Sequence, residues 1–342
     1  MKKRVYIAYT GGTIGMTGTP DGYRPAPGYL ERQIAVMPEL AGDLMPEYVI
    51  HEYAPLLDSS DMTPPDWAKI AQDIAEQYAQ YDGFIVLHGT DTMAYTASAL
   101  AFMLQGLRKP VILTGSQVPL CEVRNDARAN IITAMLLAAN YAIPEVCLFF
   151  GQYLLRGCRA VKVSAEDFDA FASPNLPPLG EVGVGIRINW DLVRDAHAAG
   201  GALHVQPLGP ATVGALRLWP GISGAVVRNL LQPPLTGLVL EAYGVGNGPS
   251  NPEFLAVLRE AADRGVVIVD CTQCLEGTVN LEGYATGSGL ARAGVISGFD
   301  MTAEAALAKL VYLLSQDLPV ERVKELVRTN LMGELTPQQS IG

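Results

Sequence analysis

The sequence predicts an α/β protein with a parallel or mostly parallel sheet that carries helices on both faces. Short apolar runs alternate along the chain with longer segments whose apolar residues recur at helical spacing. The runs contain almost no charged side chains, as strands that are covered on both faces require. Strands that alternate with helices in this way form parallel sheets.

The chain has 342 residues, a length that predicts two medium domains rather than one. Hydrophobic residues make up 49% of it and charged residues 17%, so most of the chain is expected to fold around a substantial core. The same balance fits an oligomer that buries subunit surface. The net charge of −11 argues against a nucleic-acid-binding protein, because phosphate recognition relies on lysine and arginine.

The first strand is predicted over residues 5–9, which are β-branched, aromatic or small. Gly11 and Gly12 follow it, and Thr13 stands between them and Gly15. Glycines let the backbone turn sharply or approach a ligand closely. The spacing alone leaves two interpretations equally open: a tight turn without chemistry, or a threonine hydroxyl presented to a small molecule.

The segment 17–28 is rich in glycine, proline and threonine and carries Tyr23. We expect a mobile surface loop there, which could serve as a lid. A helix over 30–37 is expected to stop at Pro38, and a strand over 48–53 to follow.

A second helix is expected to begin after Thr63, a capping residue that is followed by two prolines and by Asp66. The third unit is the clearest, with a buried strand over 83–88, a turn, and a helix over 93–107. The remaining elements are predicted as strands over 110–114, 145–150, 237–242 and 266–270 and helices over 126–141, 250–264, 302–316 and 320–331.

Between residues 173 and 210 the alternation of predicted strands and helices is replaced by irregular stretches and stretches of small polar residues. We therefore predict an N-terminal domain over 1–190, a linker over 191–212 and a C-terminal domain over 213–342.

The basic start of the chain is followed by only about five apolar residues, fewer than a signal peptide needs. No uninterrupted apolar segment approaches the length of a membrane-spanning helix, so a cytoplasmic protein is expected. Five cysteines, an odd number in a long chain, fit reduced thiols. Cys271 and Cys274 have the spacing of a redox pair, but two buried structural thiols are the favoured interpretation.

Ligands of open α/β sheets bind at the carboxyl ends of the strands. Polar residues gather at these predicted ends in four stretches: Thr13, Asp58-Ser59-Ser60, Thr90-Asp91 and Ser116-Gln117. They contain no cluster of histidine or cysteine suited to a metal. Motifs for dinucleotides and for phosphate-binding loops are also missing, so we expect neither a metal nor a cofactor.

A hydroxyl nucleophile that works without histidine needs another base, and a lysine held by a carboxylate can serve. Lys162 lies between apolar residues and is the candidate. Alone it would be interpreted as a surface lysine, but with Thr90 and Asp91 a Thr–Lys–Asp relay becomes plausible. His88 is interpreted more readily as a packed, hydrogen-bonded histidine than as a base.

Two stretches resemble the signature motifs of bacterial-type L-asparaginases, namely Tyr9-Thr10-Gly11-Gly12-Thr13-Ile14-Gly15 and His88-Gly89-Thr90-Asp91-Thr92-Met93-Ala94-Tyr95-Thr96. The resemblance covers essentially the whole chain, and the cytoplasmic type I branch is the most similar. It continues through Asp58-Ser59-Ser60-Asp61-Met62, Thr114-Gly115-Ser116-Gln117, Phe168-Asp169-Ala170-Phe171-Ala172-Ser173-Pro174-Asn175 and Ala242-Tyr243-Gly244-Val245-Gly246-Asn247.

The resemblance implies a larger N-terminal flavodoxin-like domain, a smaller C-terminal Rossmann-like domain, and a homodimer or homotetramer with shared active sites. It implies hydrolysis of L-asparagine to L-aspartate and ammonia without a cofactor. Thr13 would be the nucleophile, assisted by Tyr23, and Thr90, Lys162 and Asp91 would manage proton transfer. The turn of Gly89 and Thr90 would stabilise the oxyanion through backbone N–H groups. The residues implied in substrate binding are Asp58, Ser59, Ser60, Thr90, Asp91, Ser116 and, at a position that completes a neighbouring subunit's site, Asn247.

One position departs from the type I pattern. Enzymes of this branch can carry an activating asparagine site that uses an arginine before the Tyr-Gly-Val-Gly-Asn motif and a Thr-Gln-Cys turn. Thr272, Gln273 and Cys274 are present here, but Glu241 stands where the arginine would be. A carboxylate cannot hold the effector's carboxylate by a charged fork, so we expect weak or absent activation.

Two other functions stay open at this point. A non-catalytic amino-acid sensor would use the same cleft, although a hydroxyl–lysine–aspartate set is superfluous for binding alone. A glutaminase or a broader amidase is the alternative within the family, because larger side chains also occur at the position of Ser60.

Overall fold

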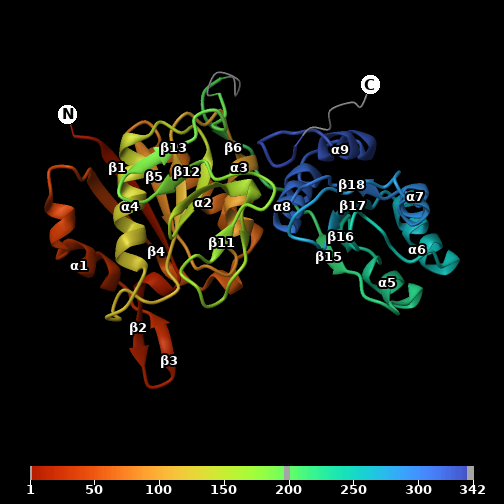
Figure 1. The fold of residues 1–342 in the computed structure, drawn as a ribbon, viewed down its shortest axis with the longest axis horizontal. Coiled ribbons are helices and arrows are strands. Elements are labelled where there is room, and N and C mark those ends of the chain that lie inside the picture. The colour runs from red at the N-terminus through yellow and green to blue at the C-terminus, as the bar shows by residue number, and fades with distance from the viewer. Residues whose placement is uncertain (1, 196–200, 337–342) are drawn as a thin grey trace. The chain divides into compact units, whose positions relative to one another are not determined.

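The computed structural model describes residues 2–195 and 201–336, and the chain divides into two compact units, Met1–Gln206 and Pro207–Gly342 (Figure 1). The predicted linker over 191–212 includes residues 196–200, which lie outside the described residues. Each unit contains a sheet covered by helices, so the predicted fold class, with a larger N-terminal and a smaller C-terminal α/β unit, is confirmed.

The sheet of the N-terminal unit has eight strands in the order β13-β12-β9-β8-β7-β5-β1-β4. The five strands from β8 to β4 are parallel, and β9, β12 and β13 continue the sheet in antiparallel pairs. The strands are β1 (Arg4–Gly11), β4 (Glu47–Leu57), β5 (Gly83–Leu87), β7 (Val111–Thr114), β8 (Val146–Phe150), β9 (Tyr153–Arg156), β12 (Gly180–Val182) and β13 (Ile186–Ile188).

Helices cover both faces of this sheet because its strands alternate side chains between the faces. Val5, Ile7 and Tyr9 of β1 lie in one buried cluster with residues of α1 and α4. On the other face, the Tyr6 hydroxyl donates to Asp73 of α2 over 2.8 Å, and α2 packs against α3 (Figure 1). The helices are α1 (Tyr29–Ala35), α2 (Pro64–Gln77), α3 (Met93–Met103) and α4 (Ala127–Asn140).

The start of α2 is capped as the sequence predicts. The Thr63 backbone N–H donates to the Asp66 carboxylate over 2.8 Å, and a reciprocal capping box closes the first turn. The helix predicted over 93–107 is shorter than expected, because α3 ends at Met103 and the chain continues as the short strand β6 (Leu104–Gln105) beside β14 (His204–Val205).

The prediction of a loop over 17–28 is wrong, because most of this segment is a hairpin of β2 (Met16–Thr19) and β3 (Gly22–Pro25). Its turn is Thr19-Pro20-Asp21-Gly22, a proline–aspartate–glycine sequence typical of tight turns. Gly22 has a φ of +106°, which only glycine adopts without strain. Figure 1 shows this hairpin projecting from the rest of the unit.

The antiparallel strands of the segment 153–188 were also not predicted. Two of them are short, with only three residues each, so they present no alternating pattern long enough to recognise. The same segment contains a small separate sheet of β10 (Val161–Lys162) and β11 (Phe171–Ala172), which carries Lys162.

The C-terminal unit has a parallel sheet in the order β15-β16-β17-β18, and two buried clusters lie on its opposite faces. Leu238 and Leu240 face α5, α6 and α7, whereas Val239 between them faces α8 and α9. The elements are β15 (Val213–Arg217), α5 (Gly224–Leu230), β16 (Gly237–Ala242), α6 (Pro252–Asp263), β17 (Val267–Thr272), α7 (Ala285–Arg292), β18 (Ile296–Ser297), α8 (Ala303–Leu314) and α9 (Val320–Val327).

Within the described residues, no helix combines the length and the apolar character needed to cross a bilayer.

Asp270, near the end of β17, is a fully buried carboxyl group in this unit. Neither of its carboxyl oxygens has a hydrogen-bond partner among the described residues. Burial raises the pKa of Asp270 to about 8. The side chain is therefore neutral in the folded protein at pH 7, while in the unfolded chain it ionises near its ordinary value of ~3.9.

Asp270 is predicted to make the fold less stable as the pH rises from about 4 to 8. Over this range only the unfolded chain gives up the proton, which costs at most about 1.4 kcal/mol per pH unit. Unfolding by urea at pH 4 and pH 8 should show that Asp270→Asn gains stability relative to the wild type as the pH rises. Equal pH slopes for the two proteins would contradict the prediction.

Candidate active site

The first turn of the site follows β1. It continues as a single helical turn over Thr13–Gly15, with Gly12 at a φ of +89°. A Cβ atom on Gly12 would lie 2.4 Å from the backbone nitrogen of Gly89. The backbone of this turn therefore touches the backbone of the turn that contains Gly89. Thr13 is half-buried at the tip of the first turn.

The second turn follows β5, the neighbour of β1 in the sheet, and contains Thr90 and Asp91. Lys162 reaches it from the small sheet of β10 and β11. The Lys162 Nζ donates to the Thr90 hydroxyl over 2.8 Å and to Asp91 Oδ1 over 2.7 Å. The structure thus brings together the three residues of the predicted relay, with Thr90 buried and Asp91 exposed to solvent.

The third turn follows β4 and contains Asp58, Ser59 and Ser60. Asp58 Oδ1 accepts hydrogen bonds from the Ser60 backbone over 3.0 Å and from the Ser60 hydroxyl over 2.8 Å. Ser59 is buried, and its carbonyl accepts from the Thr92 hydroxyl over 2.7 Å. This bond ties the third turn to the second.

The fourth turn follows β7 and presents Gln117. The Thr90 hydroxyl donates to Gln117 Oε1 over 3.1 Å, so Thr90 accepts from Lys162 and donates to Gln117 at the same time. The Asp126 carboxylate accepts from the backbone N–H groups of Gln117 and Val118 and fixes this turn. Asp126 was not singled out from the sequence, where it could only be assigned to the start of a helix.

These turns enclose a cavity of about 220 Å³, smaller than the ~300–1,000 Å³ of a pocket for a drug-sized molecule. The cavity is large enough for a single small metabolite, and most of the groups that line it are polar. Its lining residues are Gly12, Thr13, Met16, Asp58, Ser59, Gly89, Thr90, Asp91, Gln117, Lys162 and Ala165.

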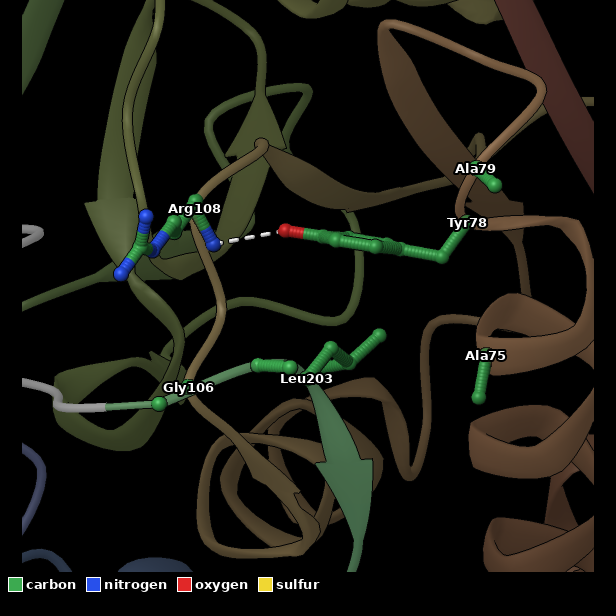
Figure 2. Close-up of a pocket in the computed structure, with 8 residues that line it drawn as sticks. Ala75, Tyr78, Ala79, Gly106, Arg108 and Leu203 are labelled. Carbon is green, nitrogen blue, oxygen red and sulfur yellow. Dashed lines mark hydrogen bonds between the residues drawn. The ribbon is translucent and has the colours of Figure 1, made fainter.

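A larger hollow of about 510 Å³ lies elsewhere in the N-terminal unit, beside the end of α2. Figure 2 shows the Tyr78 hydroxyl there, accepting a hydrogen bond from the Arg108 backbone over 2.7 Å. Ala75, Ala79 and Leu203 make its wall mainly apolar. This hollow does not bring a hydroxyl together with a lysine and a carboxylate, so the smaller polar cavity is the better candidate for chemistry.

His88 is buried behind the second turn and is not among the lining residues. Its Nδ1 lies 2.7 Å from the Gly89 carbonyl, and its Nε2 lies 2.8 Å from the Thr96 hydroxyl. Burial lowers the pKa of His88 to about 4, so the ring is neutral at pH 7. The structure favours the packed histidine over a catalytic base.

Several predicted site residues do not line the cavity. Ser116 is buried, and its hydroxyl has no hydrogen-bond partner among the described residues. Ser60 lies one residue beyond the lining, against Asp58. Tyr23 lies on β3 with half of its surface exposed, and its hydroxyl donates to Glu122 over 2.8 Å. Asn247 belongs to the C-terminal unit, where it accepts a hydrogen bond from Thr286 over 2.7 Å.

The residues of the candidate effector site lie at the ends of β16 and β17. The Gln273 side chain donates to the Glu241 carbonyl over 2.8 Å, and the Cys274 backbone donates to the Thr272 hydroxyl over 3.0 Å. The Glu241 carboxylate is ion-paired with Arg217 over 3.0 Å.

The interpretation of Cys271 and Cys274 as two buried thiols is wrong for one of them. Cys271 points into the core from β17, whereas Cys274 lies beyond the strand and is exposed. The difference arises because the strand ends at Thr272, so the second cysteine falls in the following turn.

The Gly12→Ala variant is predicted to lose most activity and to unfold more easily. The added methyl group would collide with Gly89, and the positive φ is strained for alanine, together costing about 2–4 kcal/mol. Thermal unfolding and a turnover assay measure both effects. Gly221→Ala is the matched control, since Gly221 has a φ of +92° and open space around its Cβ position. Equal losses in both variants would contradict a role for the close approach.

Comparisons with known proteins agree over the length of the chain. The family model "Asparaginase, N-terminal" matches residues 4–194, and "Glutaminase/Asparaginase C-terminal domain" matches 212–327. The chain is 57% identical over 337 residues to L-asparaginase 1 of Escherichia coli, covering 98% of this chain and 99% of that one. It is 49% identical to the human 60 kDa lysophospholipase, covering 98% of this chain and 62% of the relative.

Solved structures are similar over the same extent. The crystal structure of L-asparaginase I from Vibrio cholerae superposes with a TM-score of 0.91 at 53% identity, covering 98% of this chain and 100% of that one. The thermostable L-asparaginase from Thermococcus kodakarensis has a TM-score of 0.87 at 32% identity, with coverage of 97% and 99%. Both family models match, and relatives with more than 30% identity align with 97% or more of this chain, so the chain belongs to the asparaginase family.

Proposed function

We propose that the protein hydrolyses L-asparagine to L-aspartate and ammonia. The observation that carries the proposal is the Lys162 ammonium bound to both Thr90 and Asp91 at a polar cavity that Thr13 also lines. Two hydroxyls at one small cavity, one of them backed by a lysine and a carboxylate, suit acyl transfer from an amide. The relatives named L-asparaginase support the choice of substrate.

In the proposed reaction, the Thr13 hydroxyl oxygen attacks the side-chain amide carbon of asparagine and gives up its proton. The carbon–nitrogen bond breaks, the nitrogen takes a proton and leaves as ammonia, and an ester joins Thr13 to the substrate. Water then attacks the ester, which releases aspartate and restores the hydroxyl. We assign the first proton transfer to Tyr23 and the handling of the water to Thr90, Lys162 and Asp91.

The cavity offers complementary groups for the two ends of an amino acid. We propose that the Asp58 and Asp91 carboxylates bind the α-ammonium group and that Ser59 binds the α-carboxylate. Ser60, which lies beside the cavity against Asp58, would assist Ser59. Backbone N–H groups of the turn at Gly89 would stabilise the oxyanion, a contribution typically worth ~10²–10³ in rate. We assign Ser116 to substrate binding on the match with the family pattern; its side chain is buried and does not line the cavity.

We further propose that the protein works as a homodimer or homotetramer in the cytoplasm. Asn247 would then complete the site of another subunit. This part of the proposal rests on the match between its motif and the family pattern, and sedimentation of the purified protein tests it.

The Thr13→Ala variant is predicted to release ammonia from asparagine at least ~10⁴-fold more slowly than the wild type, because the nucleophile is missing. Thr13→Ser should keep measurable activity.

The Lys162→Met variant is predicted to release ammonia ~10²–10⁴-fold more slowly than the wild type, because proton transfer is impaired. A wild-type protein that binds asparagine without releasing ammonia would be the sensor instead, and equal kcat/KM values on asparagine and glutamine would identify a broader amidase.

Asparagine is predicted to activate the enzyme weakly or not at all. Glu241 supplies a negative charge where an effector's carboxylate would have to bind, and the Arg217 guanidinium beside it is already paired. The rate should therefore rise hyperbolically with asparagine concentration. A sigmoidal curve that becomes hyperbolic in Thr272→Ala would show that the effector site works despite Glu241.

A further inference from the structure

The turn over residues 119–125 holds the segment that carries Thr13 and the hairpin of β2 and β3. The Leu120 backbone donates to the Ile14 carbonyl over 3.2 Å. Further along, the Cys121 thiol lies 3.6 Å from the Met16 carbonyl. The Tyr23 hydroxyl donates to Glu122 Oε1 over 2.8 Å. Leu120, Cys121 and Glu122 of one turn therefore contact, in order, the helical turn of Thr13–Gly15, the start of β2 and strand β3.

The contact at Glu122 is the one that concerns the hairpin tip. Tyr23 is half exposed and lies outside the lining of the cavity, so its hydroxyl is engaged with Glu122 and not with the site. Glu122 is itself braced, because its backbone N–H donates to the Pro119 carbonyl and its carbonyl accepts from the Asn125 side chain. The backbone of Glu122 is thus held in place, and its carboxylate accepts from a tyrosine on a projecting hairpin, so the contact has the form of a latch.

The direction of this contact matters for the chemistry. A carboxylate hydrogen bond favours the protonated phenol, and it raises the pKa of Tyr23 above its ordinary value. A tyrosine held in this way is poorly suited to take a proton from Thr13. The hydroxyl has to leave Glu122 before it can assist the reaction.

We propose that Glu122 is a positioning residue that holds the hairpin of β2 and β3 in a resting, open position through Tyr23 and releases it when substrate fills the cavity. The inference rests on the proposed function, because it takes Tyr23 to act at Thr13. Binding of substrate then competes with the Glu122 contact, so part of the substrate's affinity is spent on opening the latch.

The test compares steady-state kinetics of the wild type, Glu122→Ala and Glu122→Gln with asparagine as substrate. Loss of the latch should lower the KM of Glu122→Ala by ~2–10-fold while kcat stays within about twofold, because the closed state becomes easier to populate. Glu122→Gln keeps an acceptor for Tyr23 and should lie close to the wild type. Val123→Ala, at a fully exposed neighbour on the same turn, is the matched control and should change nothing.

A second readout does not depend on turnover. Without asparagine, amide hydrogen exchange over residues 16–25 should be faster in Glu122→Ala than in the wild type and in Val123→Ala. An unchanged exchange rate would overturn the latch, as would an unchanged or raised KM. A large fall in kcat at constant KM would overturn it in favour of a direct chemical role for Glu122. Absence of ammonia release from the wild type itself would instead refute the proposed function.

Discussion

The site depends on one close approach between two backbones. Strands β1 and β5 are parallel neighbours with Tyr9 opposite Leu87, so the turns that follow them leave the sheet at the same level. Gly12 lies so near the Gly89 backbone that no side chain fits between them. Because the turns touch there, Thr13 and Thr90 are held at one small cavity.

The polar groups around that cavity lie on loops whose positions are fixed by side-chain contacts as well as by the strands of the sheet. Lys162 is carried by a separate pair of short strands, and its bonds to Thr90 and Asp91 tie those strands to the second turn. The Asp126 carboxylate accepts from the backbone of Gln117 and so holds that turn. The Gln117 side chain accepts in turn from the Thr90 hydroxyl. Each group thus has its orientation set by another, which suits a site that must align a hydroxyl with a small substrate.

The division of roles among the titratable groups follows from burial. His88 lies closest in sequence to the second turn, yet burial and its contacts with Gly89 and Thr96 keep it neutral and structural. Lys162 and Asp91 face the cavity and keep contact with solvent, so charge can be used there at lower cost. Tyr23 lies on a projecting hairpin outside the cavity lining, and its hydroxyl donates to Glu122.

The sequence by itself determined the α/β class, the main parallel strands, the capped start of α2 and the two turns around Thr13 and Thr90, because periodicity, capping and glycine spacing are local signals. It also pointed to Lys162, through its apolar neighbours. Only the tertiary structure decided that the segment 17–28 is largely a hairpin, that the short strands of 153–188 extend the sheet, and that Glu122 meets Tyr23. The hairpin and the short strands contain only three or four residues per strand, too few to show an alternating pattern. The pairing of β9 with β12 and the contact between Glu122 and Tyr23 join segments tens of residues apart, which leaves no local pattern in the chain.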